Sequence, residues 1–109
     1  MPLTTLHTAS AGFESARQVD VLPTGHKGQR LHGHSFRAKV RATLPLNWAP
    51  YPGAQVLTLS GKLDACTSQL DYRLLNELLP SPTDENLARW LRDQLDVPRL
   101  EQVGIQSTL

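Results

Sequence analysis

The chain has 109 residues, of which 39% are hydrophobic and 19% charged, with a formal net charge of +1. This length is enough for one globular domain with a modest core, so residues 1–109 are expected to form a single domain. The balanced charge argues against a nucleic-acid or membrane-surface binder. No apolar run approaches the ~20 residues of a membrane-spanning helix. Cys66 is the only cysteine, which excludes an internal disulfide and favours a cytoplasmic location.

The N-terminal half predicts two strands. Residues 3–21 have weak strand character, centred on residues 12–19, and residues 22–31 read as a loop with Pro23 and two glycines. From about Leu31 to Leu44 apolar and polar residues alternate strictly, which is typical of a strand with one buried face. The polar positions of this strand include Arg37, Lys39 and Arg41, which we expect on a solvated or cavity-lining face.

The C-terminal half predicts two helices and a last strand. A proline-rich turn at residues 45–53 and a short extended piece at residues 55–59 precede the first helix. The spacing of Leu70, Leu74 and Leu78 predicts this helix over residues 63–79, ended by Pro80.

The second helix has both a start signal and a buried stripe. Ser81 is the predicted cap, Pro82 suits the first helical position and Asp84 completes a capping box. The buried stripe is then Leu87, Trp90, Leu91 and Leu95, and the helix ends at Val97-Pro98.

Residues 103–109 read as a final strand, and the order strand, strand, helix, helix, strand predicts an α+β fold. Such a fold places two helices on one face of an antiparallel sheet. The final strand has no later strand to pair with, and exposed edges are usually covered or paired. We therefore expect self-association, or a homologous second domain that completes the sheet.

His32 and His34 are the most informative residues in the chain. They are two apart and share the apolar parity of their strand, so both side chains enter the face that is otherwise buried. Buried imidazoles need polar partners. One explanation is a shared metal ion, for which His26 or the more distant His7 could add a ligand; the other is a hydrogen-bonded structural pair.

These residues belong to a series of segments that resembles the 6-pyruvoyl tetrahydropterin synthases and the related bacterial 6-carboxy-tetrahydropterin synthases of queuosine biosynthesis. The segments, in chain order, are Phe13–Arg17, His32–Phe36 (HGHSF), Leu70–Asn76, Pro82–Ala88 (PTDENLA) and Ser107-Thr108. The resemblance implies the tunnelling fold, β-β-α-α-β-β, with its closing strand missing here, so that the chain is either complete in itself or one half of a tandem protein. It also implies an oligomeric, zinc-dependent lyase of the biopterin or queuosine pathway.

The resemblance implies a site in which His32 and His34 bind the metal, Asp71 takes part in acid–base catalysis, and Ser107 and Thr108 contact a pterin-like molecule.

Four positions of the family pattern are nevertheless replaced. Arg17 stands where the family has its first zinc-binding histidine, and an arginine has no lone pair to give. The other replacements are Gly28 for the catalytic cysteine, Tyr72 for the catalytic histidine and Ser107 for the glutamate that anchors the pterin.

The remaining candidates have structural explanations. Tyr72 is a poor proton shuttle at neutral pH because its unperturbed pKa is about 10, and packing is the preferred role. A lone Cys66 at a helical position is typical of a small buried residue. Trp48 and Tyr51 are expected to pack the proline-rich loop.

The replacements predict a degenerate tetrahydropterin-synthase-like domain, that is, a non-catalytic subunit or half-domain that keeps the oligomerising fold, with weak or absent zinc binding. The alternative is an active synthase in which His32, His34 and a substitute ligand hold zinc. A third reading is a binding module for a different planar heterocycle.

Overall fold

The computed structural model of the chain describes residues 5–19, 23–26 and 30–108. Its elements, in chain order, are β1 (His7–Arg17), β2 (His32–Ala42), α1 (Gln55–Ser68), β3 (Arg73–Leu74), the 3-10 helix η2 (Leu75–Glu77), α2 (Asp84–Leu95) and β4 (Leu100–Ser107). The predicted strands, helices and their order are therefore present, with different bounds. Gly28 and parts of the predicted loop lie outside the described residues.

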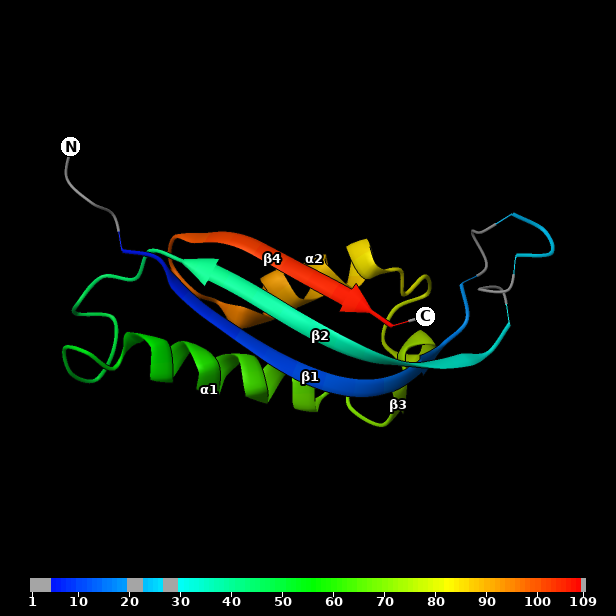
Figure 1. The fold of residues 1–109 in the computed structure, drawn as a ribbon, viewed down its shortest axis with the longest axis horizontal. Helices are drawn as coiled ribbons and strands as arrows, with labels where there is room; N and C mark the ends of the chain where they lie inside the picture. The colour runs from blue at the N-terminus through cyan, green and yellow to red at the C-terminus, as the bar shows by residue number, and fades with distance from the viewer. Residues whose placement is uncertain (1–4, 20–22, 27–29, 109) are drawn as a thin grey trace.

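The strands form one sheet in the order β3-β1-β2-β4 (Figure 1). β1 pairs antiparallel with β2 along its whole length, and β4 pairs antiparallel with the other edge of β2. β3 has only two residues and pairs parallel with β1, so the sheet is mixed where a purely antiparallel one was predicted. The α+β prediction is confirmed, and the parallel pair comes from a short segment with no alternation to reveal it.

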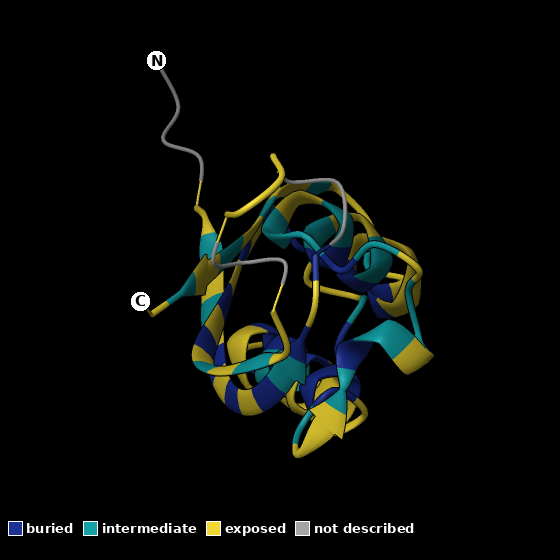
Figure 2. Cartoon of the chain, turned by 90° about the vertical axis from the view of Figure 1, so that its right-hand side faces the viewer, coloured by how far each residue is buried: buried dark blue, intermediate teal, exposed yellow. Residues whose placement is uncertain are grey.

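The alternation in β2 creates the core. Phe36, Ala38, Val40 and Ala42 are each at most 3% exposed, and the ring of Phe36 stacks on that of Phe13 with 4.9 Å between centroids. α1 and α2 cover this face of the sheet (Figure 1), and the parts of both helices that are buried in Figure 2 include leucines of the core cluster. The predicted stripe of α2 is confirmed: Leu87, Leu91 and Leu95 are buried and Trp90 packs against them.

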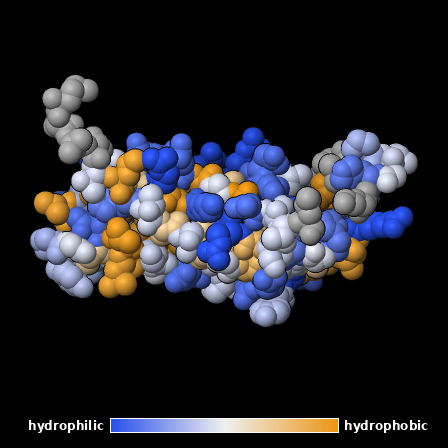
Figure 3. Space-filling view, in the orientation of Figure 1, coloured by the Kyte–Doolittle hydropathy of each residue, from blue (hydrophilic) through white to orange (hydrophobic). Residues whose placement is uncertain are grey.

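No helix of the described residues covers the opposite face of the sheet, which is polar. Arg37, Lys39 and Arg41 lie on it in a row along β2, all exposed. Figure 3 shows hydrophilic side chains interspersed with hydrophobic ones on the side of the molecule that faces the viewer in Figure 1. Among the described residues no helix is long and apolar enough to cross a membrane.

The predicted bounds of the first helix are wrong. α1 begins at Gln55, in the piece predicted to be extended, and ends at Ser68 rather than Leu79. Its buried apolar positions are Leu59, Leu63 and Cys66, and burial raises the pKa of the Cys66 thiol, as expected for a packing residue. The chain then turns: of the three leucines whose spacing predicted a continuing helix, Leu70 lies in the turn after α1, Leu74 in β3 and Leu78 in the turn after η2.

The predicted cap of the second helix is also wrong. The N-cap of α2 is Thr83, whose hydroxyl accepts a hydrogen bond from the Asn86 N–H at 3.2 Å, and Asp84 is the first helical residue. Ser81 lies two residues earlier, and its buried hydroxyl has no hydrogen-bond partner in the described structure. The proline that follows Ser81 thus precedes the cap instead of opening the helix.

The cap makes a direct prediction about stability. Thr83→Ala removes the acceptor of the Asn86 N–H and should lower the free energy of unfolding by about 1 kcal/mol. Ser81→Ala is the matched control and should cost less, because the Ser81 hydroxyl has no partner to lose. Urea unfolding followed by circular dichroism measures both; an equal or larger loss for Ser81→Ala would contradict this assignment.

Candidate functional site

The candidate residues gather at one end of the sheet, where β1 ends, β2 begins and β4 ends (Figure 1). The register of β1 and β2 sets Arg17 opposite His32 and Ser15 opposite His34. Because all four positions share the parity of the core, they continue the buried face of the sheet toward its open end. The register therefore places the histidine pair beside Arg17 and Ser15.

Both histidines are oriented by backbone carbonyls. The His32 Nδ1 lies 2.5 Å from the Arg30 carbonyl oxygen, and the His34 Nδ1 bonds to the Thr108 carbonyl oxygen. A carbonyl oxygen only accepts, so each Nδ1 carries a proton, and an imidazole in its neutral form would then keep its lone pair on Nε2. The two rings meet edge to face with centroids 4.4 Å apart.

The environment favours neutral His34. Desolvation by burial is the largest cause that lowers its pKa below the ordinary value, and the charges of Arg17 and His32 lower it further. The hydrogen bond to Thr108 acts in the opposite direction. At neutral pH the His34 imidazole is therefore uncharged.

Arg17 is the centre of a buried polar cluster. Its Nη1 donates to the Asp84 carboxylate at 2.6 Å and to the Pro82 carbonyl at 3.1 Å. The Ser107 hydroxyl donates to the other Asp84 oxygen at 3.0 Å and lies 3.4 Å from the Arg17 Nη2. The guanidinium is 5.0 Å from the centre of the Phe36 ring, and the Arg17 side chain is 10% exposed. This cluster ties β1, the start of α2 and the end of β4 together.

The residues present do not make a metal site with three protein ligands. Within residues 5–19, 23–26 and 30–108, no three His, Cys, Asp or Glu side chains lie close enough to share an ion. His26 and His7, the predicted spare ligands, do not join the pair; the His7 Nδ1 instead accepts the Leu44 N–H at 3.2 Å. The donor set is two imidazoles beside an ion-paired guanidinium.

The other predicted site residues divide between the cluster and a surface cavity. Ser107 belongs to the cluster around Arg17. Thr108 lines the cavity and exchanges hydrogen bonds with the Ser35 backbone through its hydroxyl. The Asp71 Oδ1 accepts the Glu14 N–H at 2.8 Å, so its carboxylate is attached to the backbone of β1.

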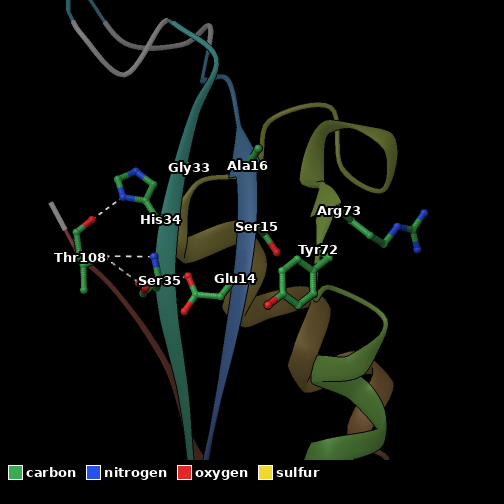
Figure 4. Close-up of a pocket in the computed structure, with 9 residues that line it drawn as sticks. All are labelled: Glu14, Ser15, Ala16, Gly33, His34, Ser35, Tyr72, Arg73 and Thr108. Carbon is green, nitrogen blue, oxygen red and sulfur yellow. Dashed lines mark hydrogen bonds between the residues drawn. The ribbon is translucent and has the colours of Figure 1, made fainter.

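The cavity has a volume of about 560 Å³ and lies across the ends of β3, β1 and β2 (Figure 4). Its lining residues are Glu14, Ser15, Ala16, Gly33, His34, Ser35, Tyr72, Arg73 and Thr108. Tyr72 and Arg73 stand on one side of β1, and His34, Ser35 and Thr108 stand on the other, with Glu14 between them. Of the predicted site residues, His34 and Thr108 line this space; His32, Asp71 and Ser107 do not.

Sequence reasoning missed two residues of this region, Asp84 and Glu14. The sequence predicts only that Asp84 completes a capping box. In the structure Asp84 pairs with Arg17, which lies 67 positions away in the chain. Glu14 alternates with buried Phe13 and Ser15, so its exposure on the other face of β1 could have been predicted.

The fold is an α+β domain in which two helices cover one face of the sheet, and a histidine pair lies where the strands end. The sequence that adopts this fold also matches a known protein family. The family model for 6-pyruvoyl tetrahydropterin synthase matches residues 7–107. The chain therefore belongs to the 6-pyruvoyl tetrahydropterin synthase family, as its motifs indicated.

Individual relatives agree with this assignment. The chain is 35% identical to the 6-carboxy-5,6,7,8-tetrahydropterin synthase of Synechocystis sp., with 88% of this chain and 81% of the relative covered. It is 28% identical to the dihydroneopterin monophosphate aldolase of Pyrococcus furiosus, with 78% and 69% covered. The 6-pyruvoyl tetrahydropterin synthase structure from Caenorhabditis elegans has a TM-score of 0.75 at 19% identity, covering 95% of this chain and 89% of that one. This likeness confirms the tunnelling fold.

The ion pair at the centre of the cluster can be measured by a double-mutant cycle. We expect Arg17→Met and Asp84→Asn each to lower the free energy of unfolding by roughly 1–3 kcal/mol, because each leaves a poorly solvated partner unpaired. The double variant should lose less than the sum of the two. Urea unfolding gives the four free energies.

The control is the exposed pair Arg92–Asp93, in which both side chains are at least 60% exposed. Its cycle should give a coupling of at most about 1 kcal/mol. A coupling between Arg17 and Asp84 no larger than that of the control would show that the cluster does not stabilise the fold.

Proposed function

We propose that this chain is a pterin-binding member of its family that does not catalyse the family's zinc-dependent reaction on its own. The observation that carries the proposal is the ion pair between Arg17 and Asp84. Arg17 stands where the resemblance implies the first zinc-binding histidine.

The chemistry of Arg17 supports the absence of catalysis. A guanidinium has five N–H donors and no lone pair, and it stays protonated at every accessible pH. The Asp84 carboxylate is already held by Arg17 and Ser107. A zinc ion bound by His32 and His34 would thus have two protein ligands, whereas catalytic zinc is held by three protein groups.

Two relatives support the ligand class. One is named for dihydroneopterin monophosphate and the other for 6-carboxy-tetrahydropterin. The two names describe different reactions, but both contain a pterin ring. Recognition of that ring is therefore the property that we extend to this chain. A cavity of about 560 Å³ has room for such a ring.

The alternative is an active synthase, favoured by one specific observation. Both histidines donate through Nδ1 to backbone carbonyls, an arrangement that orients Nε2 toward a metal in many proteins. With a substitute ligand, such as a side chain from a second copy, this pair would hold zinc, which would supply a Lewis acid.

Zinc binding separates the two functions. Equilibrium dialysis against zinc should load little metal on the wild-type protein, because two imidazoles leave the ion short of protein ligands. Arg17→His should gain about one zinc per chain by completing three histidines, and Arg17→Met, which adds no donor, is the matched control. One zinc per wild-type chain that is lost in His34→Ala would establish the alternative.

Turnover is the second measurement. Purified protein supplied with zinc and dihydroneopterin triphosphate should form no pterin product above background, since each missing acid–base group is worth about 10²–10⁴ in rate. The Synechocystis relative, assayed with the same substrate and zinc, serves as the comparison. Robust product formation by this chain would overturn the proposal.

We further propose that the chain self-associates through the free edge of β4. Among the described residues β4 pairs only with β2, and its half-buried Val103 and Ile105 pack at the margin of the core. Unpaired edges with apolar residues favour strand addition. Light scattering should give a mass above 12.1 kDa, the mass of one chain, at micromolar concentration; a mass of one chain up to high micromolar concentration would contradict this.

A further inference from the structure

Tyr72 adopts a backbone conformation that its side chain disfavours. Its φ is +53°, in the left-handed region where glycine or asparagine is usual and a bulky residue is strained. The residue is also 85% exposed. Neither the preference of the turn nor burial in the core explains a tyrosine here, and strain of this kind is concentrated at ligand-binding sites.

The strained turn is fixed to Glu14 from two sides. The Asp71 Oδ1 accepts the Glu14 N–H at 2.8 Å, and the Tyr72 N–H donates to the Glu14 carbonyl at 2.6 Å. The next residue, Arg73, pairs with Ser15 in the parallel bridge between β3 and β1. These contacts set the position of Tyr72 relative to Glu14, so Asp71 acts as a positioning residue.

Glu14 presents a carboxylate to the same cavity. Its Oε2 accepts a hydrogen bond from the Ser35 hydroxyl at 2.7 Å, which orients the group. In the described part of the chain no Lys, Arg or His nitrogen lies within 4 Å of it. Figure 4 shows Glu14 between the Tyr72 ring and the residues of β2. An oriented carboxylate without a cationic partner is an acceptor available to a ligand.

We propose that Tyr72 and Glu14 are the recognition pair of this cavity: the Tyr72 ring stacks on a planar heterocycle, and the Glu14 carboxylate accepts hydrogen bonds from its N–H edge. The pterin class of the heterocycle rests on the proposed function, whereas the residue pair rests on the geometry. This assignment replaces Ser107 as the anchor, because the Ser107 hydroxyl is engaged by Asp84 and Arg17.

The test is a titration of neopterin, a fluorescent pterin, with the full chain. Tyr72→Gly should weaken binding roughly 5–150-fold through loss of stacking, and Tyr72→Phe, which keeps the ring, should stay close to wild type. Glu14→Gln should weaken binding roughly 10–150-fold through loss of the charged acceptor. Tyr51→Ala and Glu101→Gln remove an exposed tyrosine and an exposed glutamate outside the cavity and are the matched controls.

A stability measurement distinguishes lost recognition from lost folding. Glycine adopts positive φ without strain, so Tyr72→Gly should have a urea midpoint equal to or above that of the wild-type protein. Weaker binding by a variant of equal or greater stability then reports the missing ring.

Each outcome decides a different claim. If the wild-type protein binds neopterin and the Tyr72→Gly and Glu14→Gln variants bind it equally well, the recognition pair is wrong and the proposed function stands. If the protein binds guanosine or riboflavin but not neopterin, and only these two variants lose that binding, the pair stands and the pterin class fails. If no probe binds, both fail. If Tyr72→Gly changes only the light-scattering mass, Tyr72 is an association residue and the pair is overturned.

Discussion

The pairing of β1 with β2 determines where every functional side chain of this chain lies. Eleven residue pairs run without a bulge from His7↔Ala42 to Arg17↔His32. The same register stacks Phe13 on Phe36 in the core and sets Arg17 and Ser15 against the two histidines. A shift of one residue would turn the core phenylalanine and the histidines to the opposite face together. The hydrophobic core and the site are thus fixed by a single constraint.

At the end of this pair of strands, a salt bridge occupies the place that the family resemblance gives to a metal ligand. Both arrangements hold the strand ends to neighbouring elements, but they differ in chemistry. A metal ion would leave an electrophile facing the ligand, whereas Arg17 directs its N–H groups to Asp84, to the Pro82 carbonyl and to Ser107. A buried pair of this kind can support the fold while offering no open coordination position.

The sequence predicted those elements in which a single periodic pattern of apolar residues runs through the whole strand or helix. The alternation from Leu31 to Leu44 predicted β2 and its buried face, and the spacing of Leu87, Leu91 and Leu95 predicted the stripe of α2. The first helix was misplaced because Leu70, Leu74 and Leu78 repeat at helical spacing although α1 ends at Ser68, before all three of them, and the chain turns at Tyr72. The links between Arg17 and Asp84 and between Asp71 and Glu14 join distant positions, and no local pattern encodes such contacts.

The row formed by Arg37, Lys39 and Arg41 bears on how two copies can meet. Arg37 donates to the Ser10 hydroxyl and Arg41 to the Gln102 side-chain oxygen, so their described partners are neutral and the charge of the row is not cancelled. Two such sheet faces brought together would place like charges within the ~8 Å over which physiological salt leaves them interacting. The row therefore disfavours stacking of two such sheets face to face, a repulsion that the proposed association along the edge of β4 would avoid. A substitution that neutralised the row would remove a barrier to aggregation while leaving the helix-covered core untouched.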